Sequence, residues 1–182
     1  MSGHSKWSKV KHQKATVDVV RGQAFTKASH AITIAVAAAG GVTDPAMNSR
    51  LRLAIEKARE LNMPKDRIER AIAKGKGEGG DTRESVWYEG YGPGGVAFLV
   101  ESATDNRLRT ASAIKHIFDR FGGTLAGPGA VSFLFTKKAD GEFIVRPYSG
   151  VTPDEENRQK AHKLEEELRV LPDVQRIYTN LP

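Results

Sequence analysis

A glycine-rich segment at residues 75–81, GKGEGGD, separates two stretches of the chain that have different hydrophobic patterns. It contains four glycines and no apolar side chain, a composition typical of a flexible linker. Apolar residues recur at helical spacing before it, whereas short apolar runs typical of strands follow it. A chain of 182 residues is long enough for two small domains. The sequence therefore predicts a first domain over residues 1–76, a linker over 77–81 and a second domain over 82–182.

The first domain is predicted to contain three amphipathic helices. The first runs from about Val17 to Ala39, and the first ten or so residues, which lack any apolar period, are predicted to form a mobile arm or a loosely packed lead-in. The second helix begins where Asp44 can cap it, and the third runs from Pro64 to Gly75. Short connections between such helices predict a three-helix bundle.

The second domain is predicted to give the chain an α+β fold class. A strand candidate lies at residues 86–89, ahead of a turn. From residue 96 onward the order β-α-β-β-α-β is expected, which is the ferredoxin-like pattern of an antiparallel sheet with two helices on one face. The expected elements are a strand at 96–100, a helix at 108–121, strands at 131–135 and 143–147, a helix at 153–171 and a strand at 174–180.

Positive charge is concentrated in the first part of the chain. Residues 1–80 hold 15 Lys and Arg against 7 Asp and Glu, whereas residues 81–182 hold 13 against 15, and the formal net charge is +6. Within the first thirty residues, six cationic side chains accompany a single acid, Asp18. This asymmetry is typical of a basic module that binds nucleic acid, because Lys and Arg neutralise phosphates.

The basic opening segment is the first candidate site. Its cations can neutralise phosphates whatever the base sequence, and His12 can add a hydrogen-bond donor. Trp7 can stack on an unpaired base, as in complexes with single-stranded RNA, or it can pack against the bundle as an anchor. The candidate residues of this segment are Lys6, Trp7, Lys9, Lys11, His12, Lys14, Arg21 and Lys27.

Two further groups of cations lie outside this segment. Those on the outward faces of the second and third helices either bind a polyanion or form a solvated surface, paired with Glu56, Glu60 and Glu69 three or four residues away. Arg107 and Arg109 stand in the first turn of a helix, where cations oppose the macrodipole, so they indicate either an anionic ligand or two solvated side chains. The candidates in these groups are Arg50, Arg52, Lys65, Arg67, Arg107 and Arg109.

Signatures of catalysis, cofactors and membranes are weak in the sequence. The chain has no Cys, and its five His lack the spacing of a zinc site. Residues 90–95, GYGPGG, match the dinucleotide pattern G-x-G-x-x-G, but an apolar strand follows where a helix is needed, so they predict turns between strands. No apolar run is long enough to span a bilayer. We therefore expect a cytoplasmic protein that is not an enzyme, with no cofactor, no metal and no membrane partner.

Several segments of the sequence resemble the YebC/PmpR family. They include GHSKW at 3–7, NMPKD at 62–66, YEGYGPGGVAF at 88–98, GGTLAGPGAVSFLF at 122–135 and DVQRIYTN at 173–180. The resemblance covers nearly the whole chain and implies a probable transcriptional regulator that binds DNA. The family also includes a mitochondrial translational activator of cytochrome oxidase subunit one and bacterial members tied to the ribosome. A translation factor bound to RNA or to the ribosome is therefore the alternative, since phosphate-neutralising side chains serve either polymer.

The resemblance also implies a difference in length. Family members carry a third, usually acidic domain, which is inserted between the strand VSFLF and the terminal helix and strand. Here residues 135–156, FTKKADGEFIVRPYSGVTPDEE, cross that junction in a short span. The chain is therefore identified as a shortened member of the family that keeps the basic helices and the terminal helix and strand.

Overall fold

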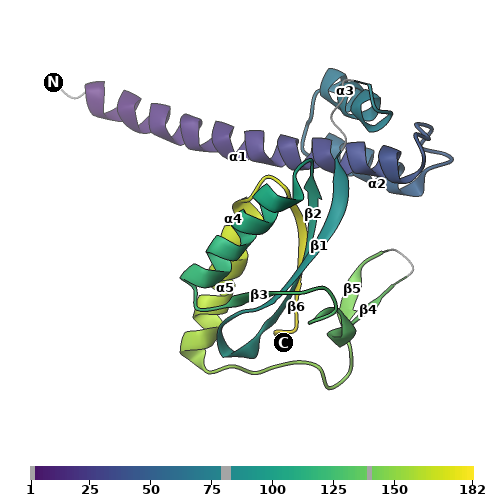
Figure 1. Ribbon diagram of the computed structural model, residues 1–182. Helices are drawn as coiled ribbons and strands as arrows, with labels where there is room; N and C mark the ends of the chain where they lie inside the picture. The colour runs from purple at the N-terminus through teal and green to yellow at the C-terminus, as the bar shows by residue number, and fades with distance from the viewer. Residues whose placement is uncertain (1–2, 79–82, 139–140) are drawn as a thin grey trace. The chain divides into compact units, whose positions relative to one another are not determined.

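The computed structural model describes residues 3–78, 83–138 and 141–182, with side chains described from residue 20 onward (Figure 1). The chain divides into two compact units, Met1–Thr82 and Arg83–Pro182. The first unit is helical, and the second combines helices with antiparallel strands. The predicted α+β fold class, with three N-terminal helices ahead of a β-rich domain, is confirmed.

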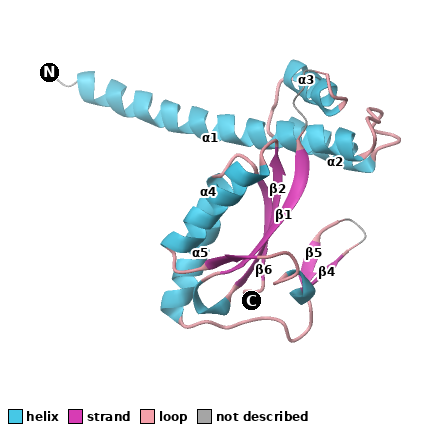
Figure 2. Cartoon of the chain, in the orientation of Figure 1, coloured by secondary structure: helices cyan, strands magenta, loops and turns pink. Residues whose placement is uncertain are grey.

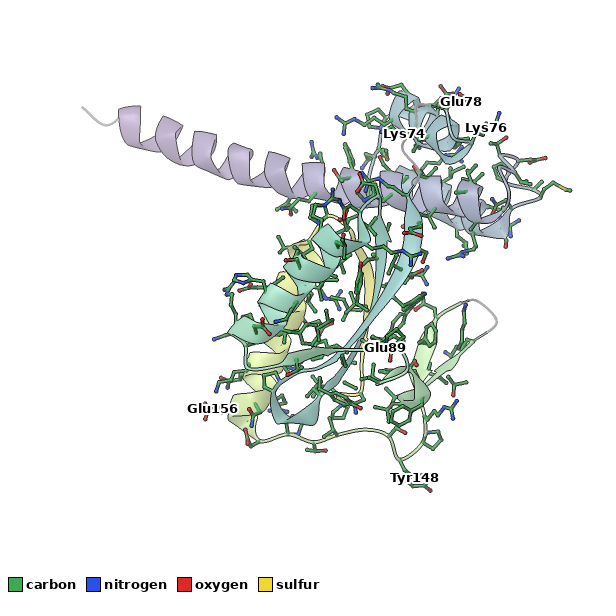
Figure 3. The ribbon with its side chains drawn as sticks, viewed as in Figure 1. Lys74, Lys76, Glu78, Glu89, Tyr148 and Glu156 are labelled. Carbon is green, nitrogen blue, oxygen red and sulfur yellow. The ribbon has the colours of Figure 1, made fainter. Side chains whose placement is uncertain are left out.

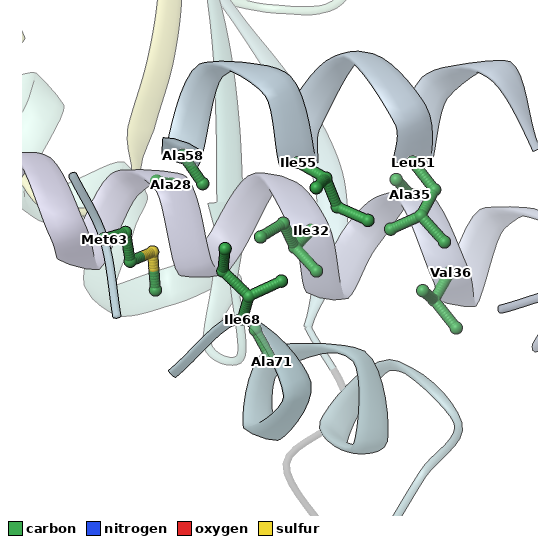
Figure 4. Packing of buried hydrophobic residues seen from close by; sticks show 10 residues of the cluster. All are labelled: Ala28, Ile32, Ala35, Val36, Leu51, Ile55, Ala58, Met63, Ile68 and Ala71. Atoms are coloured by element: carbon green, nitrogen blue, oxygen red, sulfur yellow. The ribbon is translucent and has the colours of Figure 1, made fainter. Parts of the chain in front are cut away.

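The first unit consists of α1 (Gly3–Ala38), α2 (Ser49–Glu60) and α3 (Lys65–Gly75). Both shorter helices pack on the C-terminal half of α1, and Figure 4 shows their apolar side chains meeting there. The fully buried side chains of this core are Ile32, Val36, Leu51 and Ala58.

The helix α1 begins much earlier than the sequence predicted. Its backbone is helical from Gly3, so the predicted helix start at about Val17 was wrong, and the residues expected to form an arm or lead-in belong to the helix. The segment at 3–16 contains four Lys, which have good helix propensity, but it has no apolar face. A prediction based on apolar periodicity therefore could not detect it.

The start of α2 also differs from the prediction. Asn48 is the N-cap, because its side-chain oxygen accepts a hydrogen bond from the backbone N–H of Leu51 at 3.0 Å. Its side-chain nitrogen donates to the carbonyl oxygens of Ala35 at 2.9 Å and Val42 at 3.1 Å. Asp44 instead accepts from the N–H of Ala46 in the preceding turn. The buried amide of Asn48 thus joins the end of α1 to the start of α2.

Replacing Asn48 by Ala is expected to lower the free energy of unfolding by about 2 kcal/mol. The substitution removes the cap and leaves two carbonyl groups in contact with Asn48 without their donor. Urea unfolding followed by circular dichroism measures the loss. Asp44→Ala, which removes a cap from an exposed turn, is the matched control, and an equal loss in both variants would contradict the role given to Asn48.

The second unit is built on a sheet whose strand order is β3-β1-β2-β6, with every neighbouring pair antiparallel (Figure 2). The helices α4 and α5 pack against one face of this sheet over Val96, Phe98 and Val100. The four strands of the sheet are β1 (Glu84–Tyr91), β2 (Ala97–Thr104), β3 (Thr124–Ala126) and β6 (Val174–Thr179). The two helices are α4 (Arg107–Arg120) and α5 (Glu155–Val170). The path β2-α4-β3, with β1 between the two strands, is a split β-α-β unit of the ferredoxin-like kind.

The remaining strands are placed differently from the prediction. The stretches at 131–135 and 143–147 were expected to join the main sheet, but β4 (Phe135–Lys137) and β5 (Phe143–Val145) form a separate two-stranded sheet. The strand candidate at 86–89 belongs to β1, which is central in the main sheet. Three-residue strands carry too little alternation for their partners to be predicted.

A second apolar cluster covers the other face of the main sheet. The buried side chains Ala97 and Leu99 of β2 pack there with Val131 and Phe135. Three aromatic rings extend this cluster, with centroid distances of 5.1 Å between Trp87 and Phe143 and 5.3 Å between Phe143 and Tyr178. The β4–β5 hairpin is therefore attached to the sheet by its inward-facing rings.

Candidate nucleic-acid interface

The exposed surface of α2 carries cations whose charge is not compensated. Arg52, Lys57 and Arg59 are exposed, and no ion pair joins them to an acid among the residues that the structure describes. Glu56 and Glu60 lie on the same helix but do not come within ion-pair distance of them. These three cations of α2 therefore do not form the ion pairs that their spacing from Glu56 and Glu60 allows.

The surface of α3 is different. Lys65 pairs with Glu69 at 3.5 Å, and Arg70 pairs with Asp66 one helical turn away. These pairs are exposed, so each contributes little to stability, but they compensate the charge of α3 locally. The expectation of a solvated, paired face fits this helix.

Arg67 and Arg21 lie at the junction of α1 and α3. The guanidinium carbon of Arg67 stands 5.5 Å from the centre of the Phe25 ring, within the range of a cation–π interaction. Arg21 is exposed and precedes Phe25 by four residues on α1, so both belong to one face of that helix. This junction presents the guanidinium group of Arg67 beside an aromatic ring, with Arg21 one helical turn away on α1.

The other candidates of the first unit follow the helices. Lys27 is half-buried in α1, and Arg50 is exposed in the first turn of α2. Lys57, Arg59 and Lys76 were not among the predicted site residues, although all three are exposed and without an ion pair in the described part of the chain. Figure 3 shows Lys74 and Lys76 near the end of α3. Six candidates lie on α1 with side chains outside the described residues, namely Lys6, Trp7, Lys9, Lys11, His12 and Lys14.

Arg107 and Arg109 are engaged by acids of their own unit. Arg107 forms two hydrogen bonds to the carboxylate of Glu84. Arg109 donates to Asp105 at 2.7 Å and to Asp173 at 3.1 Å. The hydrogen bonds from the two arginines hold the pKa of Glu84 and of Asp105 below their ordinary values. These internal pairs account for two Arg in the first turn of α4, so an anionic ligand is not needed to explain them.

The glycine motif at 90–95 forms the turn between β1 and β2, as the sequence predicted. A Cβ atom on Gly90 would lie 2.7 Å from the carbonyl oxygen of Thr124, and one on Gly92 would lie 2.6 Å from the ring of Phe98. Gly94 adopts a φ of 68° and would meet Pro153 at 2.5 Å. Atoms of the same unit thus fill the space beside these glycines. Close packing therefore explains why glycine occupies these positions of the motif.

The described residues form neither a metal site nor a membrane-spanning helix. Among them, no group of three or more His, Asp or Glu side chains is arranged to hold a metal ion. Within the described helices, none combines the length and the apolar character that crossing a bilayer requires.

Comparison with family models places both units. The model of the TACO1/YebC protein N-terminal domain matches residues 5–78, and that of the TACO1/YebC second and third domain matches residues 83–143. The chain belongs to the TACO1/YebC family. This confirms the resemblance found in the sequence.

The relatives within the TACO1/YebC family are longer proteins. A probable transcriptional regulatory protein of Sulfurihydrogenibium sp. (strain YO3AOP1) is 54% identical over 139 residues, which are 76% of this chain and 55% of the relative. One of Treponema denticola is 55% identical over 139 residues, again 76% of this chain and 56% of the relative. The chain thus spans about half the length of these curated relatives, which is consistent with a shortened form.

A solved structure shares the fold of this chain. The crystal structure of a conserved hypothetical protein from Aquifex aeolicus is 34% identical, with a TM-score of 0.81. The similarity covers 92% of this chain and 93% of that one.

Proposed function

We propose that this TACO1/YebC chain is a non-enzymatic regulator of gene expression that binds DNA through the cations of its first unit. The observation that carries the proposal is the set of exposed cations on α2, Arg52, Lys57 and Arg59, which form no ion pair with any described residue and lie in a segment with a strong positive excess. Unpaired surface cations are available to neutralise phosphates and to release counterions. The printed names of the relatives, probable transcriptional regulatory proteins, support regulation as the role.

The second candidate is a translation factor bound to RNA or to the ribosome. Neither α2 nor α3 contains Asn or Gln, the side chains that contact adenine edges in the major groove. Their exposed cations suit phosphates, which carry no sequence information. This composition favours recognition of nucleic-acid shape, which is typical of folded RNA.

Removing the cations of the first unit is expected to weaken binding and its dependence on salt. Replacing Arg52, Lys57 and Arg59 by Ala should reduce the slope of log affinity against log salt by about 2–3 for duplex DNA. Replacing Lys6, Lys9, Lys11 and Lys14 by Ala should reduce it by about 3–4. Fluorescence anisotropy with a labelled duplex over a series of salt concentrations measures both slopes.

The matched control removes cations that are already paired. Arg158 and Lys160 on α5 pair with Glu155 and Glu156, so replacing them by Ala is expected to leave the slope nearly unchanged. Unchanged affinity and slope in both first-unit variants would show that this surface is not the binding site.

Ribosome co-sedimentation, run beside a duplex-DNA shift at the same salt, separates the two candidates. If the chain regulates transcription by binding DNA, duplex binding is expected to persist at a salt concentration where ribosome binding is lost. The reverse result would establish the translation factor and refute the transcriptional role.

A further inference from the structure

Most cations of the second unit form ion pairs with acids, and most of the exceptions lie in or beside the β4–β5 hairpin. Of the thirteen Lys and Arg in residues 83–182, four form no ion pair with a described residue. Three of these four, Lys137, Lys138 and Arg146, belong to the β4–β5 hairpin or the residue that follows it, and the fourth, Lys163, lies on α5. The paired ones are Arg83, Arg107, Arg109, Lys115, Arg120, Arg158, Lys160, Arg169 and Arg176.

The hairpin and the single 3-10 turn that precedes it, Ser132–Leu134, also expose apolar side chains. Phe133 is 58% exposed and Ile144 is 44% exposed, although both are large and apolar. The backbone N–H of Arg146 donates to the carbonyl of Leu134 at 2.9 Å, which extends the pairing of β4 and β5. Arg146 therefore lies at the open end of the hairpin, with Phe133 and Tyr148 just outside the paired strands, whereas Lys137 and Lys138 lie toward the closed end. The exposed rings and the cations are thus arranged along one hairpin.

Tyr148 combines a fully exposed side chain with an unfavourable backbone conformation. The residues from Arg146 to Ser149 form a turn closed by a hydrogen bond of 3.1 Å, with Pro147 at the second position and Tyr148 at the third. Tyr148 has a φ of 62°, as this position of a type II turn requires, where Gly or Asn is normally found. Its side chain is fully exposed, and Figure 3 shows it pointing away from the unit. Folding alone would favour Gly here, so the ring is retained against a conformational cost.

We propose that the β4–β5 hairpin is a second nucleic-acid contact, which takes single-stranded segments. In this contact, unpaired bases stack on the rings of Phe133 and Tyr148, and Lys137, Lys138 and Arg146 neutralise the adjacent phosphates. Exposed rings beside cations that form no ion pair with a described acid complement the flat bases and the negative backbone of a single strand. Bases inside a duplex do not offer their faces, so this contact prefers single strands. The site is independent of the surface of the first unit and of its proposed function.

The experiment compares the full chain and its variants in binding a labelled oligouridylate, a labelled oligothymidylate and a duplex of the same length. Tyr148→Gly combined with Phe133→Ser is expected to lower the affinity for the single strands by roughly tenfold or more. Replacing Lys137, Lys138 and Arg146 by Ala is expected to reduce the salt slope for single strands by about 2. Duplex affinity, which reports on the first unit, is expected to stay unchanged in both variants.

Three controls keep the outcome clear. Tyr148→Gly alone relieves the positive φ, so it should raise thermal stability while it weakens single-strand binding, and a folding defect cannot produce that combination. Lys163→Ala and Leu108→Ala remove an unpaired cation and an exposed apolar side chain elsewhere in the unit, and neither should change binding.

Single-strand affinity that is unaffected by the ring substitutions overturns the proposal. So does equal competition by poly-L-glutamate, since that result identifies an acidic protein segment as the occupant. The first-unit variants can also contradict the proposal. If they lose duplex and single-strand binding together, while the hairpin variants bind single strands as tightly as the wild type, the hairpin is not a separate site and the proposal is refuted. A difference between the oligouridylate and the oligothymidylate shows whether RNA or DNA supplies the strand.

Discussion

Replacing Glu89 by Ala is expected to lower the free energy of unfolding of the second unit by about 4 kcal/mol. The carboxylate of Glu89 is buried and accepts hydrogen bonds from the backbone N–H groups of Gly129 at 2.9 Å, Val131 at 2.7 Å and Ser132 at 2.9 Å. The substitution leaves three donors without their acceptor, and burial makes that loss costly. Urea unfolding of the full chain with Trp7 replaced by Phe, followed by the fluorescence of Trp87, measures it.

The matched control is Glu156→Gln. Glu156 is an exposed carboxylate that pairs with Lys160 at 2.6 Å on α5, and Figure 3 labels it together with Glu89. Its loss should change stability by less than about 0.5 kcal/mol, as is usual for an exposed pair. A comparable effect of the two substitutions would refute the anchoring role of Glu89.

The same interaction makes stability depend on pH. Burial acts to raise the pKa of Glu89, but the backbone hydrogen bonds from Val131, Gly129 and Ser132 outweigh it, and the pKa lies below its ordinary value. A carboxyl whose pKa is lowered on folding stabilises the folded state above the unfolded pKa. That contribution is lost as the pH falls through the folded pKa. The stability difference between the wild type and Glu89→Gln should therefore be largest near neutral pH and shrink in acid below about pH 4.

Replacing Gly75 by Val is expected to destabilise the first unit by about 3 kcal/mol. Gly75 is the last residue of α3 and is buried against α1. A Cβ atom there would lie 2.6 Å from the Cβ of Val36 and 2.7 Å from the carbonyl oxygen of Thr33, both fixed on α1. The two helices would have to separate along their shared core. Thermal unfolding followed at the helical circular-dichroism signal measures the effect.

Gly22→Val provides the control for this prediction. Gly22 is exposed on α1, and a Cβ atom there meets nothing within 4 Å. Since Val has a better helix propensity than Gly, this variant should be at least as stable as the wild type. If Gly75→Val is tolerated equally well, the close approach of α3 to α1 is not required.

Parts of the candidate site could be predicted from the sequence and parts could not. The positive excess and the outward cations of α2 follow from counting residues and from helical periodicity, which are local properties. Whether Arg52 pairs with Glu56, or Arg109 with Asp173, depends on side-chain positions. Asp173 lies 64 residues from Arg109 along the chain, and no local pattern indicates such a partner. The exposed rings of the hairpin escaped prediction because their segment was expected to join the main sheet.

The amino-acid sequence by itself determined the fold class, the family and most of the element types. Helical periods and glycine-rich turns are set by neighbouring residues, so they can be recognised without a structure. The motifs at 88–98 and 122–135 identified the family in the same way.

Only the tertiary structure decided how these motifs meet. The carboxylate of Glu89 in the first motif is held by the backbone at 129–132 in the second, which explains why an acid stands beside the glycine turn. The structure also decided which strands share the main sheet and why Gly75 must be small. The physical reason is the same in each case. Hydrogen bonds and close contacts between residues far apart in the chain depend on how whole elements pack, and short strands or single residues carry no local pattern that specifies their partners.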